Sequence, residues 1–235
     1  MKKILLILVV AALISCSDSK KIAEGENGKE PTNFKPEITQ HDIKVSMEYL
    51  ASDELEGRAT GTVGIEKAAV FIENYFKENG IKPYFETYRD TFNLGNIIGY
   101  NIVGMIEGYD PALKDEFIIL GGHYDHIGEG KEVNGDKIAN GANDDASGTI
   151  AAMEFGKYFA KSKTNKRSIL ITLYAAEEIG LKGSGHLAKR LKSKGMDAYT
   201  MINFEMIGVP RAETESTAYM SGYERSNFAE TLNKY

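Results

Sequence analysis

Residues 117–126 read FIILGGHYDH: an apolar run, two glycines, and a polar segment with two histidines and an aspartate. A short apolar run that ends at glycine is typical of a β-strand covered on both faces. Residues 168–174 and 199–204 show similar runs, each soon followed by acidic residues. Helical periodicity at residues 146–162 and 184–192 separates these strands. Strands that alternate with helices predict an α/β fold, a mixed, largely parallel β-sheet sandwiched between helices.

Upstream of this stretch, the sequence predicts two helices and two strands. Apolar residues recur at helical spacing at residues 43–50 and, more strongly, at residues 64–79. Residues 84–92 alternate between apolar and polar side chains, and residues 97–106 are apolar and rich in β-branched residues, which is typical of strands. We expect all these elements to belong to one domain, residues 38–235.

Composition and charge exclude several classes of protein. The 235 residues carry 28 Lys and Arg against 34 Asp and Glu, and the formal net charge of −6 argues against nucleic-acid binding through a general positive field. Hydrophobic residues make up 42% and charged residues 26%, so we expect neither a disordered chain nor a polytopic membrane protein. The single cysteine excludes an intramolecular disulfide.

The N-terminus predicts export. Two lysines precede an apolar run at residues 4–14, which matches a secretory signal and is too short to span a bilayer. The following Leu13-Ile14-Ser15-Cys16 resembles the lipobox of bacterial lipoproteins. We expect a signal peptide at residues 1–15, lipidation of Cys16, and a flexible polar tether at residues 16–37. The protein would then be anchored by lipid to the bacterial cell envelope, on the periplasmic or outer-membrane surface. The alternative is an ordinary signal peptide with a chance cysteine.

Candidate functional residues follow the predicted strands. His123 and Asp125 come after the first apolar run, and in an extended His-x-Asp both side chains leave on the same side, so Asp125 can orient His123. Asp144 and Asp145 stand at the start of a predicted helix. One of them could be an N-cap, but two adjacent carboxylates need a cation or a helix N-terminus to compensate their charge.

Two more acidic groups complete the pattern. Glu177 and Glu178 follow residues 168–174 and could serve as general base and metal ligand, although a Glu-Glu pair is also common on solvated helices. Glu205 comes directly after residues 199–204. Four strand ends thus offer carboxylates, one with a histidine as well. Nitrogen and oxygen ligands without thiolate suit zinc, with cobalt or manganese as substitutes.

These motifs resemble those of the secreted zinc-dependent aminopeptidases with two co-catalytic zinc ions. Relatives of that family include plasma glutamate carboxypeptidase, glutamate carboxypeptidase II, glutaminyl cyclase and the transferrin receptor. The similarity runs from about Leu50, through the segment SDELEGR at residues 52–58 and Gly61, to Gly208. It implies a zinc-exopeptidase-like fold for most of the chain.

The resemblance also implies a role for each candidate residue. It implies four zinc ligands: His123, Asp144, Glu178 and Glu205. Among these, Asp144 would bridge both ions, Glu178 would belong to the second ion, and the other two would belong to the first. Asp125 would orient the histidine, Glu177 would be the general base, and the peptide bond between Asp144 and Asp145 would be cis.

The chain departs from the family pattern at two positions. The family usually has Asp where this chain has Glu205, which adds a methylene and keeps the chemistry. The family's last ligand, a histidine of the second zinc, has no counterpart here, because none of the four histidines follows Glu205: His41, His123, His126 and His186. We expect His126 to orient a ligand or to face substrate, and His41 and His186 to be structural or solvated. A predicted helix from about Ser226 is cut by the chain end, so we expect a catalytic domain truncated at its C-terminus.

The prediction is therefore a zinc-dependent exopeptidase, most simply an aminopeptidase that hydrolyses N-terminal residues from peptides. Glu177 would take a proton from a metal-bound water as it attacks the scissile carbonyl, and pass that proton to the leaving amine. Two alternatives are a glutaminyl-cyclase-like transferase that uses one zinc and a non-catalytic, peptidase-derived binding lipoprotein. We expect no nucleic-acid partner, and contact with a membrane through the lipid anchor only.

Overall fold

The computed structural model describes residues 36–210 and 220–234. The predicted signal peptide, Cys16 and nearly all of the predicted tether lie outside these residues. Within the described ranges, no helix combines the length and the apolar character needed to cross a bilayer.

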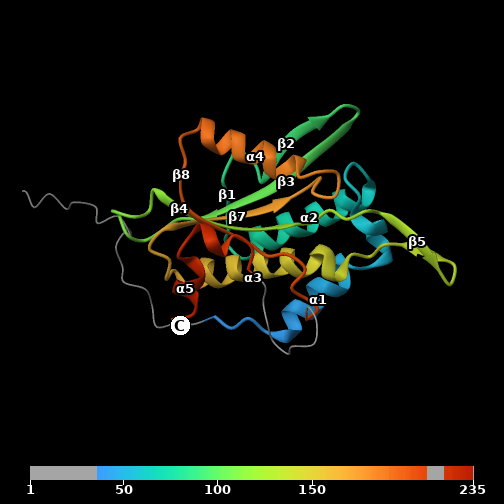
Figure 1. Cartoon of the computed structure of the whole chain (residues 1–235), viewed down its shortest axis with the longest axis horizontal. Coiled ribbons are helices and arrows are strands. Elements are labelled where there is room, and N and C mark those ends of the chain that lie inside the picture. Colours follow the sequence, from blue (N-terminus) through green and yellow to red (C-terminus); the bar gives the residue numbers. More distant parts are fainter. Residues whose placement is uncertain (1–35, 211–219, 235) are drawn as a thin grey trace, which may run out of the picture.

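A mixed sheet forms the centre of the molecule (Figure 1). Its strand order in the described chain is β1 (Lys82–Pro83), β3 (Ile97–Ile106), β7 (Ser168–Tyr174), β4 (Glu116–His123) and β8 (Asp197–Asn203), and β2 (Arg89–Leu94) also pairs with β3. The strands β7, β4 and β8 are parallel, whereas β3 is antiparallel to β7, β1 and β2. The predicted mixed sheet is confirmed, and its parallel part is the half that begins at β7.

Helices cover both faces of the sheet (Figure 1). On one face lie α2 (Val63–Glu78) and α3 (Ser147–Ser162), with α1 (Gln40–Leu50) beyond them, and on the other lies α4 (Lys182–Ser193). Strand β7 is buried along its whole length, and its alternate side chains enter the two apolar clusters on either side of the sheet. This double burial explains why its sequence is a continuous apolar run.

Shorter elements connect this framework. The 3-10 helix η1 (Asp53–Arg58) precedes α2, and the π-helical turn η2 (Ala142–Ala146) leads into α3. A two-stranded hairpin of β5 (Glu129–Val133) and β6 (Asp136–Ile138) projects from the body (Figure 1). The chain described after the gap contains η3 (Tyr223–Arg225) and α5 (Phe228–Leu232). Only part of the strand expected at residues 84–92 forms, because β2 begins at Arg89.

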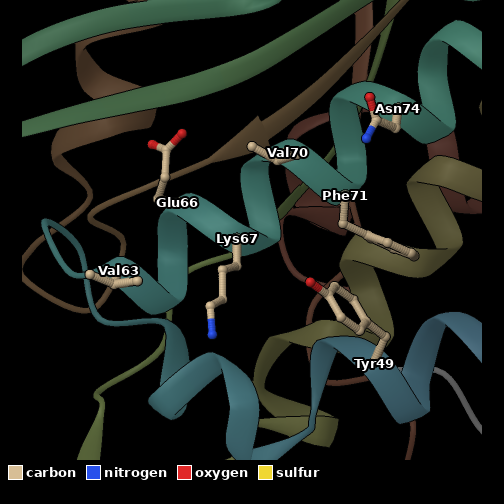
Figure 2. A pocket seen from close by; sticks show the side chains of 7 residues that line it. All are labelled: Tyr49, Val63, Glu66, Lys67, Val70, Phe71 and Asn74. Atoms are coloured by element: carbon tan, nitrogen blue, oxygen red, sulfur yellow. The ribbon is translucent and has the colours of Figure 1, made fainter.

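A hollow of about 330 Å³ lies on the outer surface of α2 beside α1 (Figure 2). Tyr49 of α1 and Phe71 of α2 contact each other there, with ring centroids 4.8 Å apart. The hollow is lined mainly by apolar atoms of seven residues: Tyr49, Val63, Glu66, Lys67, Val70, Phe71 and Asn74. It contains none of the predicted site residues, so it is separate from the site described next.

Candidate metal centre

The candidate residues gather at the carboxyl ends of the parallel strands. His123 is the last residue of β4, Glu177 and Glu178 follow β7, and Glu205 follows β8. Asp144 comes from η2, at the start of α3. Parallel strands end at the same edge of a sheet, so residues far apart in sequence converge there.

The imidazole of His123 is the centre of this group. Its side chain is 2% exposed, and its Nε2 atom lies 3.1 Å from Asp144 Oδ1, 3.4 Å from Glu205 Oε1 and 3.9 Å from Glu177 Oε2. That nitrogen is buried and makes no hydrogen bond of good geometry with any described residue. A buried nitrogen without a partner is costly, and carboxylates around it are the setting of a bound cation.

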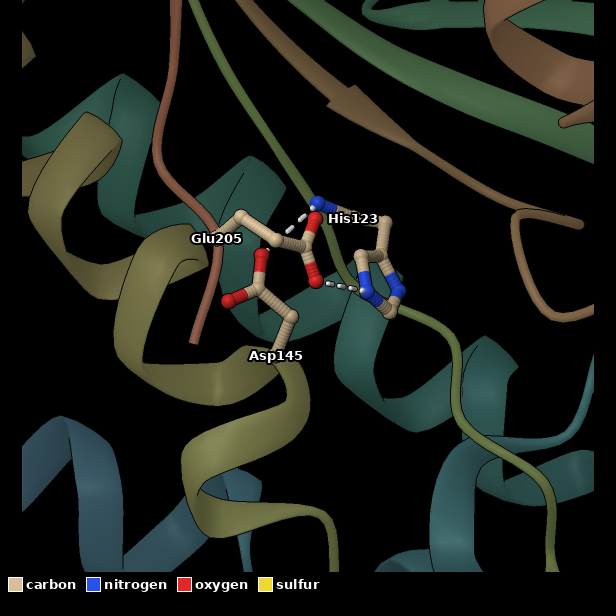
Figure 3. Close-up of side chains that lie close together, drawn as sticks. All are labelled: His123, Asp145 and Glu205. Atoms are coloured by element: carbon tan, nitrogen blue, oxygen red, sulfur yellow. Dashed lines mark hydrogen bonds and ion pairs between the residues drawn. The ribbon is translucent and has the colours of Figure 1, made fainter. Parts of the chain in front are cut away.

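Among residues 36–210 and 220–234, two overlapping sets of side chains could hold a metal ion. One is His123, Asp144 and Glu178; the other is His123, Asp145 and Glu205, and in each set the candidate ligand atoms lie within 4.8 Å of one another. Figure 3 shows the carboxylate of Glu205 turned toward the imidazole of His123, whereas the carboxylate of Asp145 is turned toward the backbone nitrogen of His123. Imidazole nitrogen with carboxylate oxygens is a donor set that fits zinc. The residues present therefore fit the metal that the sequence predicts.

Asp144 and Asp145 have different environments. The Asp145 carboxylate is fully buried and accepts three backbone N–H groups, from His123 (3.2 Å), Gly148 (3.1 Å) and Met206 (3.0 Å). Burial raises the pKa of Asp145 to about 7, although the hydrogen bond from Met206 opposes this shift. Asp145 thus joins β4, α3 and the chain after β8. Asp144 is partly exposed and lies 3.1 Å from His123 Nε2, so it is better placed than Asp145 to hold a metal ion. The peptide bond between them is cis.

Asp125 contacts both His123 and the chain that carries Glu177. His123 Nδ1 lies 3.1 Å from the backbone oxygen of Asp125 and 3.5 Å from its Oδ1 atom. The same Oδ1 accepts the backbone N–H of Glu177 at 3.1 Å, and Oδ2 accepts the hydroxyl of Thr60 at 3.2 Å. Asp125 therefore lies beside the imidazole that it is predicted to orient, with its backbone oxygen closer than its carboxylate, and it also fixes the backbone of Glu177.

The local charges alter the pKa values of two groups in the site. Burial lowers the pKa of His123, but the contacts of its ring with Asp125 and Glu205 and the charges of Asp145 and Asp125 outweigh it and raise the pKa to about 11. Burial also raises the pKa of Glu177. The positive charge of His123 lowers this pKa, and the negative charges of Glu178 and Glu205 raise it. A raised pKa makes Glu177 a stronger base than an ordinary glutamate.

The other histidines have separate partners. His126 Nδ1 lies 2.6 Å from Glu178 Oε1, so it contacts one of the predicted metal ligands. This contact fits the first of the two roles expected for His126, the orientation of a ligand. His186 lies on α4 beside Asp90 (3.3 Å) and the ring of Phe92, and His41 is exposed on α1.

Sequence reasoning missed Arg58. Its guanidinium is buried and donates to the backbone oxygens of Tyr124 (2.9 Å), Asn140 (2.6 Å), Gly141 (2.9 Å) and Leu50. Burial lowers the pKa of Arg58 to about 10, whereas nearby carboxylates, Asp125 foremost, oppose the shift. Arg58 thus places a positive charge beside the acidic site and fixes the segments on either side of it. Arg58 lies in the segment SDELEGR, which carried part of the family resemblance, but the sequence indicated no role for it.

The glycine before Arg58 allows a close approach of two chain segments. Gly57 has φ +66°, and a Cβ atom there would lie 2.2 Å from the backbone oxygen of Gly128. The N–H of Gly128 also donates to the oxygen of Gly57 at 3.0 Å. A side chain at residue 57 would therefore separate η1 from the chain that follows His126.

Comparison with known proteins gives a family match, related sequences and similar solved structures. Peptidase family M28 matches residues 101–235. A probable zinc metalloprotease of Pyrenophora tritici-repentis is 37% identical over 117 residues, which cover 49% of this chain and 26% of the relative. This chain spans about a quarter of the length of the curated relatives that it matches first.

Two solved structures have similar folds at 27% sequence identity. The Acidobacteriales bacterium glutaminyl cyclase has a TM-score of 0.58, and the match covers 77% of this chain and 63% of that one. The LapA aminopeptidase of Legionella pneumophila has a TM-score of 0.56, with 72% of this chain and 43% of that one covered.

Proposed function

The chain belongs to peptidase family M28, and from this premise we propose that it forms the metal site of a zinc-dependent exopeptidase, an aminopeptidase that hydrolyses N-terminal residues from peptides. The observation that carries the proposal is the buried Nε2 atom of His123, which is surrounded by carboxylates and makes no hydrogen bond with any described residue. The similarity to the LapA aminopeptidase supports the choice of reaction.

Four residues would hold zinc: His123, Asp144, Glu178 and Glu205. When bound, zinc supplies Lewis acidity that polarises the scissile carbonyl and favours deprotonation of the attacking water. We propose two ions in a complete site. Of the described residues, Asp144 and Glu178 would hold the second ion, and His126 would orient Glu178 through the 2.6 Å contact.

Glu177 is the proposed general base. Its carboxylate is partly exposed, so it can reach a water molecule, and its Oε2 atom lies 3.9 Å from His123 Nε2, next to the ligands. Its raised pKa suits a group that takes the proton of the attacking water and passes it to the leaving amine. Asp125 holds the backbone N–H of Glu177, which limits the positions that this carboxylate can reach.

The decisive variant is Glu177→Gln. We expect it to keep zinc, measured by elemental analysis, and to lose turnover of aminoacyl anilides by about 10²–10⁴-fold, because general-base catalysis typically contributes that factor. Glu86→Gln, in which an exposed carboxylate is changed in the same way, is the control and should retain turnover. Full activity of Glu177→Gln would disprove the assigned role.

A glutaminyl-cyclase-like transferase is the second candidate. The 27% identity to the Acidobacteriales glutaminyl cyclase favours it, and the M28 match itself does not distinguish the two reactions. Peptides with N-terminal glutamine separate them: a cyclase forms pyroglutamate, whereas an aminopeptidase releases glutamine. A zinc-loaded protein that does neither would support the third alternative, a non-catalytic binding protein.

We also propose that the protein is exported and anchored by lipid at Cys16, after removal of residues 1–15, with residues 16–37 as a tether. The support is the sequence Leu13-Ile14-Ser15-Cys16 after a short apolar run. Cys16→Ser should move the protein from the membrane fraction to the soluble fraction and abolish labelling by a fatty-acid analogue. If the variant still carried the label, lipidation at Cys16 would be excluded.

A further inference from the structure

The loop between β7 and α4, residues 175–181, carries both glutamates of the site, and we call it the Glu loop. Three consecutive backbone N–H groups of this loop donate to side chains from three other segments: Ala175 to Asn101 Oδ1 (3.2 Å), Ala176 to Thr60 Oγ1 (2.9 Å) and Glu177 to Asp125 Oδ1 (3.1 Å). The backbone that leads to the proposed base is thus fixed from outside the loop.

Asn101 of β3 joins the two ends of the Glu loop. It is fully buried, and while its Oδ1 accepts the N–H of Ala175, its Nδ2 donates to the backbone oxygen of Gly183 in the first turn of α4 (3.0 Å). Nδ2 also donates to Asp90 Oδ2 at 2.9 Å. A carboxylate only accepts hydrogen bonds, so Asp90 determines which way the amide of Asn101 points.

The packing at this point leaves no space for another side chain. A Cβ atom on Gly183 would lie 2.1 Å from the backbone oxygen of Ala175 and 2.3 Å from Asn101 Oδ1. The charge of Asp90 is balanced from α4, because Arg190 Nη1 lies 2.6 Å from Asp90 Oδ1. The orientation of Asn101 is therefore fixed by a buried, compensated carboxylate.

Thr60 links the Glu loop to Asp125. Its hydroxyl accepts the N–H of Ala176 and donates to Asp125 Oδ2 at 3.2 Å. A hydroxyl can do both at once, whereas a methyl group of the same size can do neither. Thr60 therefore fixes the loop directly and also fixes the carboxylate that holds Glu177.

The Glu loop needs such support because its backbone is unusual. Ala176 and Leu181 both have positive φ, +58° and +57°, which non-glycine residues rarely adopt and which costs free energy. The loop closes on itself through the bonds from Lys182 N to the oxygen of Ala176 and from Leu181 N to the oxygen of Glu177, both 2.9 Å. These internal bonds define its shape, and the external bonds define its place relative to His123.

We propose that Asn101 and Thr60 are positioning residues for Glu177 and Glu178. They act through the backbone of the Glu loop and do not touch the reacting atoms. The inference deepens the proposed function, since it concerns the base and a metal ligand of the same site. A displacement of about 1 Å of a catalytic group can reduce turnover about 10²-fold, so the effect is measurable.

The test compares each variant with a matched control. Asn101→Asp removes two donated bonds and places a second carboxylate beside Asp90. Its control is Asn165→Asp, because Asn165 is also a buried asparagine that donates to two backbone oxygens, of Glu107 (3.2 Å) and Arg167 (2.9 Å), near the opposite end of β7. Thr60→Val is compared with Thr62→Val, and Thr60→Ser, which keeps the hydroxyl, should restore wild-type behaviour.

Three readouts are made on the full chain: native-state hydrogen exchange of Ala175, Ala176 and Glu177, zinc affinity by competition with a chelator, and kcat and KM. We expect Asn101→Asp and Thr60→Val to speed exchange of these amides at least tenfold beyond the change in global stability. We expect zinc affinity and kcat to fall by roughly 10–100-fold, as for other groups that orient metal ligands, with KM little changed. The controls should lower global stability without these changes.

Two failures are distinguishable. If the loop amides and zinc affinity change no more in these variants than in the controls, the positioning role is wrong. If the wild-type protein binds zinc but hydrolyses no peptide, the proposed function fails, and hydrogen exchange and zinc affinity still decide the role of Asn101 and Thr60. If Asn101→Asp does not fold, Thr60→Val and Thr60→Ser decide it.

Discussion

A guanidinium group inside a protein needs several acceptors to replace lost water, and for Arg58 they are backbone oxygens from three separate segments. One acceptor belongs to Tyr124, between His123 and Asp125, and two belong to Asn140 and Gly141, just before η2. Loss of this side chain would leave backbone carbonyls without their donor and would remove a buried positive charge whose pKa responds to the carboxylates of the site.

We therefore expect Arg58→Met to lower the free energy of unfolding by more than about 3 kcal/mol, because each buried acceptor left unpaired costs about 1–3 kcal/mol. Urea unfolding followed by circular dichroism measures the change. Arg225→Met, at an exposed arginine of η3, should change stability by less than about 0.5 kcal/mol. Equal stability of the two variants would show that the buried hydrogen bonds of Arg58 contribute nothing.

At the residue scale, the sequence predicted the candidate ligands better than the residues that support them. His123, Glu178 and Glu205 end or follow strands at one sheet edge, and Asp144 stands at the start of α3, so a pattern of strands, helix starts and acidic residues was sufficient to propose them. Arg58 and Asn101 could not be found in this way, because their partners are mostly backbone atoms distant in sequence. A pattern of side chains in the sequence does not show which backbone atoms a residue will bind. The residue pattern alone did not distinguish Asp144 from Asp145. The family resemblance implied Asp144 as the ligand, and the three N–H donors of Asp145 give the physical reason for the difference.

At the scale of elements, a buried polar cluster joins the three helices on one face of the sheet. Lys157 of α3 lies 2.5 Å from Glu154 Oε2 and 2.9 Å from Asp42 Oδ2 of α1, and the hydroxyl of Tyr75 of α2 donates to Glu154 Oε1 at 2.6 Å. Lys157 and Glu154 are both buried. Lys157 thus forms the ion pair that joins α1 to α3 in this cluster.

Lys157→Met should destabilise the protein by about 3–5 kcal/mol, since it leaves the carboxylate of Glu154 buried without its cation. Lys161→Met, the same change at an exposed position of α3, is the control. Thermal or urea unfolding measures both variants. A loss no larger than in the control would show that Glu154 and Asp42 do not need Lys157.

The ion pair between Lys157 and Asp42 predicts how the stability lost in Lys157→Met depends on pH. The hydrogen bond from Lys157 lowers the pKa of Asp42 below 3.8, so this contribution is present above that pH and is lost as the pH falls through the folded pKa. Burial alone would lower the pKa of Lys157, but hydrogen bonds to Glu154 and Asp42 raise it above 10.5, so its contribution is lost only as the pH rises through that higher value. The stability difference between wild type and Lys157→Met should therefore be constant at intermediate pH and shrink at both extremes.

Helices and strands were predictable from the sequence where their burial produces a clear pattern of apolar residues. Strand β7 is covered on both faces, and α2 shows a regular apolar stripe, so both were predicted near their observed bounds. The hairpin of β5 and β6 was not predicted, because every residue of β5 is exposed and its sequence therefore shows no alternation of apolar and polar residues. Residues 84–88 alternate without forming a strand.

At the scale of the whole molecule, the site is built from two parts of the chain, and only one of them lies within the match to family M28. The M28 match begins at residue 101 and includes the candidate ligands. Arg58 and Thr60 lie before that point, yet they bind the segments that carry His123 and Glu177. Residues 101–235 alone would therefore contain the ligands without these contacts.

The place of β7 in the sheet has a consequence for folding. Strand β7 pairs with β3 on one side and β4 on the other, yet it follows both in the chain. During synthesis, β3 and β4 emerge first and cannot complete the sheet until Ser168–Tyr174 is available. Each then exposes an unpaired edge, which is the feature that makes incomplete β-proteins aggregate. A nascent chain that stops before β7 therefore exposes edges at which it can aggregate, and the sheet can form only late in synthesis.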